Sequence, residues 1–349
     1  MNGLGLRRTE RYAGAGGHGP SAAHVLALAV GLALALAVPV QAQEQAPAAD
    51  SGAPAGASEP APPEQSAGEP SAAGEGELTI RADRDRITVG QRVTFTGRRR
   101  PERSGQVVEL QYRPAGAIFR TVAETEANRD GMYEVGARPR RSGAFRAVSP
   151  GPGGTLRSES VDVAVRASLT LDARRNQLRA RGVKVTGELR PRDAGRRIVI
   201  QRRTGKGWET LAATRTGDAG GFHTRFEPPR LGAYRLRARV GGNRANLGDR
   251  AALGHPVYVY REDQASYYGP GFFGNQTACG QTLREDTVGV AHKTLPCGTR
   301  VRFHYRGRTR RVEVIDRGPF IEGRRWDLTE GARSELRFPR GVDEIWADR

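Results

Sequence analysis

The run VEVIDRGPF, residues Val312–Phe320, decides the fold at the C-terminal end of this chain. Its apolar residues up to Ile315 predict a buried strand, and Asp316 then stands directly before a Gly-Pro turn. A carboxylate at the end of a strand faces the rim of a domain, where it can carry protons. The alternative is that Asp316 only caps the turn by accepting hydrogen bonds from backbone N–H groups.

Two neighbouring runs belong to the same unit. ASYYGPGFFG spans Ala265–Gly274, and TACGQTL…VAHKTLPCGT lies within Thr277–Thr299. Glycines let a backbone approach a ligand closely, and tyrosines stack on flat ligand faces. Together with RRWDLT at Arg324–Thr329, these runs place the chemically informative residues between Ala265 and Trp346.

Short alternating apolar runs in this part predict strands at Thr299–Tyr305, Arg308–Ile315 and Glu344–Trp346, separated by glycine turns. One short helix is expected at Thr329–Leu336, because Thr329 is a good N-cap residue. A small closed β-barrel fits this rhythm.

The composition favours a β-rich protein with many turns. The 349 residues include 46 Gly and 21 Pro, and only 6% are aromatic, which argues against a large helical core. Residues 78–349 carry 53 basic and 30 acidic residues. Such an excess attracts anionic polymers, and for an exported protein we expect anionic cell-wall polymers rather than nucleic acid. The alternative is a basic background that only maintains solubility.

The N-terminus has the pattern of a secretory signal peptide over residues 1–42. Arg7, Arg8 and Arg11 precede an apolar run at Val25–Val38, and small residues up to Ala42 suit cleavage. The run is shorter than the roughly 20 residues that a membrane-spanning helix needs, although an uncleaved anchor is the alternative. We therefore expect a secreted or cell-envelope protein, in the periplasm or the cell wall. No cysteine lies near Ala42, so a lipoprotein is not expected.

Residues 43–77 consist mainly of Ala, Pro, Gly, Ser and Glu. Such a segment has too little apolar surface to offset the entropy lost on ordering, so it is predicted to be a disordered acidic tether.

The next part, residues 78–260, contains an internal repeat. VTFTG at Val93–Gly97 recurs as VKVTG at Val183–Gly187. Similarly, GQVVELQ at Gly105–Gln111 recurs as GRRIVIQ at Gly195–Gln201. Short alternating runs between turn residues predict one immunoglobulin-like β-sandwich for each unit.

The two sandwiches are expected at residues 78–166 and 167–260. We expect them to be spacers or weak binders, and a dedicated ligand site is the alternative. A short linker is predicted at Asn243–Arg261, although Val257–Tyr260 can pair as an extra strand with either neighbour.

The C-terminal runs, in this order and spacing, resemble the rare lipoprotein A (RlpA) family over residues 265–346. The resemblance implies a six-stranded double-psi β-barrel at residues 262–349, a fold shared with expansins. Enzymes of that family cleave the β-1,4 bond between N-acetylmuramic acid and N-acetylglucosamine in peptidoglycan glycan strands free of stem peptides. The muramic C6 hydroxyl attacks C1 and gives a 1,6-anhydro product. This attack can run with one carboxyl group, whereas hydrolysis normally needs two.

The resemblance implies roles for individual residues. Asp316 would be the acid and base, with Asp327 as the neighbouring carboxylate that helps to keep it protonated. His292 would hold Asp316 or a sugar hydroxyl, unless its hydrogen bond is only structural. Tyr267 and Tyr268 would form a stacking floor for sugar rings. Trp326 is a weaker stacking candidate that suits barrel packing better. The other expected substrate-binding residues are Gly269, Thr277, Gln281, Thr294 and Arg317.

Two features depart from the family pattern. Gln281 stands where the family often has glutamate, and a glutamine cannot transfer protons, so the acid–base role rests on Asp316. Cys279 and Cys297 are the only cysteines, and in an exported protein they predict a disulfide. A reactive or metal-binding pair is the alternative, but further cysteine or clustered histidine ligands are missing. We expect neither a metal nor another cofactor.

Three functions remain open. The first is a secreted peptidoglycan lytic transglycosylase that uses Asp316. The second is a non-catalytic, expansin-like protein that binds cell-wall polysaccharide, and Gln281 favours it. The third is a structural wall protein in which the sandwiches matter most. In each case we expect a monomer.

Overall fold

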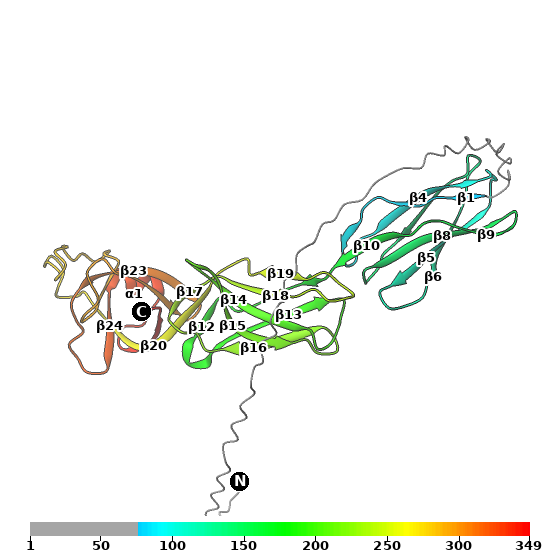
Figure 1. The fold of residues 1–349 in the computed structure, drawn as a ribbon. Helices are drawn as coiled ribbons and strands as arrows, with labels where there is room; N and C mark the ends of the chain where they lie inside the picture. The colour runs from blue at the N-terminus through cyan, green and yellow to red at the C-terminus, as the bar shows by residue number, and fades with distance from the viewer. Residues whose placement is uncertain (1–75) are drawn as a thin grey trace, which may run out of the picture. The chain divides into compact units, whose positions relative to one another are not determined.

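A computed structural model describes residues 76–349 of the chain (Figure 1). The predicted signal peptide, residues 1–42, and all but the end of the predicted tether lie outside the described residues. Glu77, assigned to the tether from sequence, belongs to a strand. Strands dominate the described part, which has one α-helix, so the prediction of an all-β protein is confirmed. Within residues 76–349 no helix is long and apolar enough to cross a membrane.

The first repeat consists of two sheets packed around the side chains of Phe95 and Phe145, whose ring centroids lie 4.5 Å apart. One sheet has the order β1-β4-β2, with β7 paired to β4, and the other has the order β3-β10-β8-β5-β6, with β9 paired to β8. The bounds are β1 Glu77–Leu78, β2 Arg81–Ala82, β3 Arg86–Thr88, β4 Val93–Arg100, β5 Val107–Pro114, β6 Arg120–Glu126, β7 Met132–Ala137, β8 Gly143–Gly151, β9 Gly154–Arg157 and β10 Val161–Arg166.

The second repeat has its own core, built around Ile198, Ile200 and Leu236. Its sheets have the orders β11-β13-β16 and β15-β14-β18-β19. The bounds are β11 Ser168–Leu169, β12 Asn176–Leu178, the 3-10 helix η1 Arg179–Arg181, β13 Val183–Arg190, β14 Arg197–Thr204, β15 Gly207–Arg215, β16 Gly221–Phe226, β17 Gly232–Tyr234, β18 Leu236–Val240 and β19 Asp249–Ala252.

The glycine shared by the two repeat motifs has a steric cause. Gly97 lies opposite Tyr133 on β7, and Gly187 lies opposite Phe222 on β16. A Cβ atom on either glycine would overlap the aromatic ring on the neighbouring strand. The VTFTG and VKVTG runs therefore end in glycine because an aromatic ring of the neighbouring strand occupies the space that a side chain would need.

The predicted linker at Asn243–Arg261 is wrong for about half of its length. Asp249–Ala252 forms β19 and pairs with β18 of the second repeat. The following strand, β20 Val257–Tyr268, is continuous: Val257–Tyr260 pairs with β17 and β12, and the remainder pairs with strands of the C-terminal part. The strand crosses the polar residues Arg261–Gln264 without a break, so the change of partner strands coincides with no turn residue in the sequence.

The C-terminal part is a ring of six strands in the order β20-β24-β21-β23-β22-β25, closed by pairing of β25 with β20. β20 and β24 are parallel, as are β21 and β23. The interior is filled by Trp326, Phe303 and Phe338 among others. The bounds are β21 Gly289–Ala291, β22 Arg300–Tyr305, β23 Arg308–Asp316, β24 Arg324–Thr329, α1 Glu330–Leu336 and β25 Asp343–Ala347.

The predicted helix is confirmed as α1. The Oγ1 atom of Thr329 accepts a hydrogen bond from the backbone N–H of Ala332 at 3.2 Å, as an N-cap residue should. The predicted strands at Thr299–Tyr305, Arg308–Ile315 and Glu344–Trp346 are confirmed as β22, β23 and β25.

Candidate active site

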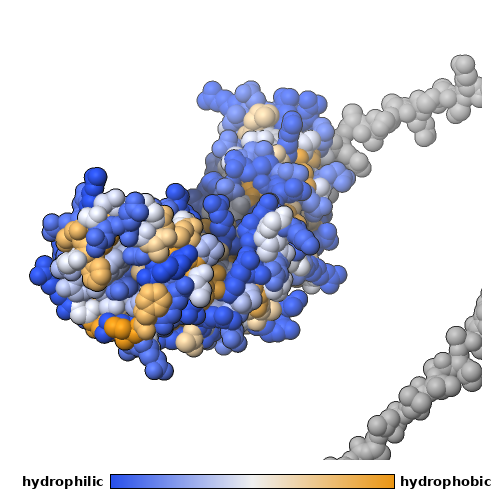
Figure 2. Space-filling view, turned by 90° about the vertical axis from the view of Figure 1, so that its left-hand side faces the viewer, coloured by the Kyte–Doolittle hydropathy of each residue, from blue (hydrophilic) through white to orange (hydrophobic). Residues whose placement is uncertain are grey.

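A groove with a volume of about 450 Å³ opens at the end of the barrel where β20 and β23 terminate. Six of the residues predicted from sequence line it: Tyr267, Tyr268, Thr277, Asp316, Arg317 and Asp327. In the space-filling view of this end of the molecule, hydrophobic patches interrupt a mostly hydrophilic surface (Figure 2).

The two aspartates of the groove lie on either side of one residue. Ala291 of β21 pairs with Asp316 of β23 on one side and with Asp327 of β24 on the other. Adjacent strands lie about 4.8 Å apart, so the two Cα atoms are separated by about 10 Å. The closure of the barrel therefore brings together two carboxylates that the sequence places in separate motifs.

Asp327 is a partly buried carboxylate that already has one hydrogen-bond donor. Its Oδ1 accepts a hydrogen bond from Ser266 Oγ at 2.8 Å. Burial raises the pKa of Asp327, and the charge of Asp316 raises it further, while Ser266 and Arg324 act in the opposite direction. Asp327 therefore holds a proton more readily than an exposed aspartate does.

Asp316 is held by the backbone on one side. Its Oδ1 accepts hydrogen bonds from the N–H groups of Ala278 and Arg317, both at 2.8 Å. The turn-capping role considered from sequence is therefore real, but it occupies only one of the two oxygens. Among residues 76–349, Oδ2 has no hydrogen-bond partner. The carboxyl group is fixed in orientation and keeps one oxygen for a ligand.

Tyr268 presents an unpaired hydroxyl group to this groove. Its Oη atom is buried and has no hydrogen-bond partner within the described residues. Burial raises the pKa of Tyr268 far above its usual range, and the charge and side-chain contact of the neighbouring Asp316 carboxyl group raise it further, so the hydroxyl stays protonated. The hydroxyl therefore faces the Asp316 carboxyl group without a hydrogen bond of ordinary geometry, and it can donate to that group or to a ligand oxygen.

The groove also has apolar walls that sequence reasoning missed. Phe272 is 55% exposed and meets Tyr268 edge-on, with ring centroids 6.3 Å apart. Phe320 is 82% exposed and Ile321 is 54% exposed, and both line the groove. Exposed aromatic side chains beside a cleft suit stacking on sugar rings. Their signal in the sequence was a phenylalanine shortly after each of two Gly-Pro pairs, Gly269-Pro270 and Gly318-Pro319. Asn275 and Gln276 line the groove as well and gave no signal.

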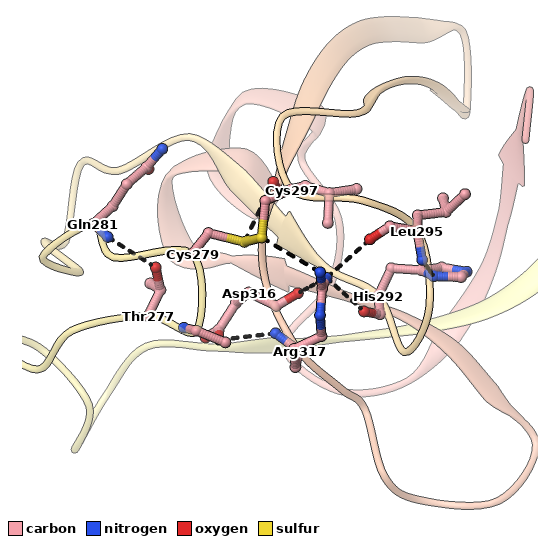
Figure 3. Close-up of a disulfide and its surroundings, with 10 residues drawn as sticks. Thr277, Cys279, Gln281, His292, Leu295, Cys297, Asp316 and Arg317 are labelled. Carbon is pink, nitrogen blue, oxygen red and sulfur yellow. Dashed lines mark hydrogen bonds between the residues drawn. A yellow bond between two sulfur atoms is a disulfide. The ribbon is translucent and has the colours of Figure 1, made fainter.

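The predicted disulfide between Cys279 and Cys297 is confirmed, with Cα atoms 5.8 Å apart (Figure 3). It joins the turn that carries Ala278 to the loop that follows β21. Arg317 braces the same loop, since its Nη1 atom donates to the carbonyl oxygen of Leu295 at 2.9 Å. The guanidinium of Arg317 is therefore engaged by protein and serves to hold the loop.

His292 lies behind the groove and does not line it. Its Nδ1 atom accepts hydrogen bonds from the backbone N–H groups of Thr294 and Leu295, at 3.1 and 3.0 Å. The ring is buried against Trp326, with centroids 4.5 Å apart, and burial lowers the pKa of His292. Its contact with Asp316 is through the backbone, where His292 N–H donates to the Asp316 carbonyl oxygen at 3.1 Å.

Four other predicted residues are outside the groove lining. Gln281 is exposed, and its side chain points away from Asp316 (Figure 3). Thr294 is exposed on the loop after β21. Gly269 is buried, and a Cβ atom there would lie 3.0 Å from the ring of Phe273. Trp326 is fully buried, with Nε1 donating to Asp263 at 3.0 Å, so it packs in the barrel, as the sequence favoured.

Comparison with known proteins finds a similarity to one family over the barrel. Residues 262–342 match the model of a family described as lytic transglycolase, a double-psi β-barrel domain. The chain is 43% identical over 74 residues to the endolytic peptidoglycan transglycosylase RlpA of Campylobacter jejuni. It is 47% identical over 115 residues to the probable RlpA of Synechocystis and 46% identical over 96 residues to that of Nostoc.

These similarities are confined to one part of each protein. The matches cover 21%, 29% and 26% of this chain, and 27%, 35% and 25% of the three relatives. The chain therefore spans well under half the length of the curated relatives that it matches, and the similarity concerns the barrel.

Proposed function

Residues 262–342 are an RlpA-like double-psi β-barrel domain, and on that premise we propose that this protein is a peptidoglycan lytic transglycosylase with Asp316 as its acid and base. The observation that carries the proposal is the free oxygen of Asp316, held in a groove that also contains Asp327, the unpaired Tyr268 hydroxyl and exposed aromatic walls.

The proposed substrate is a peptidoglycan glycan strand, free of stem peptides, cleaved between N-acetylmuramic acid and N-acetylglucosamine. The C1–O4 bond breaks while the muramic O6 atom forms a new bond to C1, which gives a 1,6-anhydro end. The protonated carboxyl of Asp316 gives its proton to the departing O4, and the resulting carboxylate takes the proton of the C6 hydroxyl. The bond cleavage consumes no water, so one carboxyl group can perform both transfers in turn.

The neighbouring residues support this chemistry. Asp327 has a raised pKa and can hold a proton itself, so it would help to keep Asp316 protonated, as expected from the sequence, only in its ionised form. The Tyr268 hydroxyl can donate to a sugar oxygen, and Phe272 and Phe320 can stack on sugar rings. His292 and Arg317 act behind the groove by fixing the loop after β21.

The remaining parts of the chain fit delivery to the cell envelope. We assign residues 1–42 to a signal peptide for export and residues 43–77 to a tether. The two repeats, residues 78–166 and 167–260, then act as immunoglobulin-like sandwiches that separate the barrel from its point of attachment. On this view the protein works as a monomer and needs no cofactor.

A second candidate is glycan binding without turnover. It is favoured by Gln281, which cannot transfer a proton, and by the exposed walls of the groove, which suit binding alone. The two candidates share the groove and differ in whether a product is released.

The test is product analysis with the full chain. Purified peptide-free glycan strands are incubated with the protein, and anhydromuramyl ends are sought by mass spectrometry. We expect them with the wild type and with Asp286→Asn, an exposed carboxylate outside the groove lining, but not with Asp316→Asn. Strands that bind and sediment with the protein without any anhydro product would establish the second candidate instead.

A further inference from the structure

Both sandwiches carry the same unit of glutamine, arginine and aromatic ring on one sheet. In the first repeat Arg146 donates to Gln111 Oε1 from Nε at 3.0 Å, and its guanidinium lies 4.0 Å from the ring centre of Phe119. In the second repeat Arg237 donates to Gln201 Oε1 at 2.8 Å and lies 4.0 Å from the ring centre of Trp208.

The pairing of the strands shows that these units are equivalent. Gln111 of β5 pairs with Arg146 of β8, and Gln201 of β14 pairs with Arg237 of β18. A second arginine approaches the same ring in each repeat: Arg113 is 4.6 Å from Phe119, and Arg203 is 5.7 Å from Trp208. The unit was therefore retained in both copies.

The two copies differ two residues further along the same paired strands. In the first repeat Glu109 pairs with Val148, and Val148 pairs with Arg157. In the second repeat the corresponding residues are Val199, Arg239 and Arg250, with Arg239 between the other two.

This difference changes the charge of the sheet. The second repeat has lost the carboxylate of Glu109 and gained an arginine directly opposite another arginine. Like charges opposite each other on neighbouring strands destabilise a sheet, so an anion bound between these arginines would relieve the repulsion.

The face formed by Arg203, Arg237, Arg239, Arg250 and Trp208 is called the arginine face below. Within residues 76–349 none of its four arginines forms an ion pair with a carboxylate. Asp249, on the same sheet, accepts a hydrogen bond from the Leu169 N–H at 2.8 Å. Glu209 pairs with Arg202 at 2.8 Å. The nearby acidic groups are thus engaged elsewhere.

The arginines also repel one another electrostatically. Burial lowers the pKa of Arg237, and the charges of Arg250, Arg239 and Arg203 lower it further. Residues Arg237, Arg239 and Arg250 line a depression of about 500 Å³ on this part of the molecule. Leu236, Ala238 and Val240, which alternate with Arg237 and Arg239 along β18, are in the core, so these arginines are on the outer side of the sheet.

We infer that the arginine face of the second sandwich binds a linear anionic polysaccharide. Guanidinium groups match carboxylates in two-pronged geometry, and a half-buried tryptophan beside them offers an apolar surface for a sugar ring. Arg203 and Arg250 are two strands apart, and Arg203 is four residues along β14 from Val199, the residue in line with Arg250, so the face extends for about 16 Å and an extended chain can cross it. No large apolar side chain of residues 167–260 is exposed, and this favours a soluble polymer over a membrane surface.

The test measures binding of the full chain to polygalacturonate, with neutral dextran and phosphatidylglycerol vesicles as further probes. Replacing both Arg239 and Arg250 with serine should weaken polygalacturonate binding about tenfold. The matched control removes two arginines from the first sandwich, Arg113→Ser with Arg157→Ser. It changes the net charge equally and should alter the affinity less than twofold. Wild-type binding should weaken as salt increases.

The results separate this inference from its competitors. Equal weakening by the two double variants would mean that only total charge matters and would overturn it. So would binding to dextran as tight as to polygalacturonate, or binding to the vesicles but not to polygalacturonate. The Arg239 and Arg250 double variant should also unfold at an unchanged or higher temperature, because it removes a repulsion, so weakened binding cannot be ascribed to misfolding. Asp316→Asn should leave this binding unchanged.

Discussion

Ala278 donates its backbone N–H to Asp316 Oδ1 at 2.8 Å, and this bond ties the orientation of the proposed acid to the turn beside the disulfide. The neighbouring residue, Cys279, is bonded to Cys297. The carboxyl group that we propose to transfer protons is therefore oriented by a segment that is itself cross-linked to the loop after β21.

The first prediction concerns this cross-link. Replacing both Cys279 and Cys297 with serine should lower the free energy of unfolding by about 3 kcal/mol, the chain-entropy value for a loop of this size. It should also reduce the rate of glycan cleavage, because the Ala278 N–H loses its fixed position. Calorimetry and product release measure the two effects. Loss of stability with an unchanged rate in the folded variant would show that the turn does not orient Asp316.

The second prediction concerns Asp316 itself. General acid–base catalysis by one residue contributes about 10²- to 10⁴-fold, so Asp316→Asn should slow anhydro-product release by at least about 100-fold. Asparagine keeps an oxygen that can accept the two backbone bonds, so the fold should persist. Asp286→Asn serves as the control because it is exposed and outside the groove lining. An active Asp316→Asn enzyme would exclude the proposed mechanism.

The third prediction separates positioning from proton transfer. His292→Ala removes a buried ring and leaves two backbone N–H groups without an acceptor, so it should cost about 2–4 kcal/mol of stability. Because the histidine is outside the groove lining, the pH profile of the remaining activity should keep its shape. A profile that loses one limb in this variant would instead assign His292 a direct role in proton transfer.

Much of the barrel could be read from the sequence because its signals are local. The Gly-Pro turn after Asp316, the N-cap at Thr329 and the cysteine pair are each decided by a few neighbouring residues, and all three hold in the structure.

The rest depends on long-range pairing. The approach of Asp327 to Asp316 depends on β21, which inserts Ala291 between them, and no local pattern encodes that register. The same is true of His292, whose ring turns behind the loop to accept two backbone bonds. It is also true of β20, which runs from one core to the next without a turn residue between them.

The fourth prediction follows from the raised pKa of Asp327. A carboxyl group whose pKa is higher in the folded than in the unfolded protein favours folding while it is protonated, and this contribution is lost as the pH rises through the folded-state pKa. Asp327→Asn cannot ionise, so its stability relative to the wild type should increase as the pH is raised from about 3 to 7. Urea unfolding at several pH values measures this. A constant difference across that range would show that Asp327 ionises like an exposed aspartate.

The last prediction uses opposite effects on stability and binding. Tyr268→Phe removes a buried hydroxyl that faces the Asp316 carboxyl group without a hydrogen bond of ordinary geometry, so the free protein should become more stable by about 1 kcal/mol. The same change should weaken glycan binding about tenfold, because a donor to the sugar is lost. Tyr305→Phe is the matched control, since the Tyr305 hydroxyl donates to Asp343 at 2.6 Å away from the groove, and its removal should lower stability without affecting binding. Thermal unfolding and glycan titration of both variants give the comparison. If Tyr268→Phe instead behaved like Tyr305→Phe, the hydroxyl would belong to the fold and not to a ligand site.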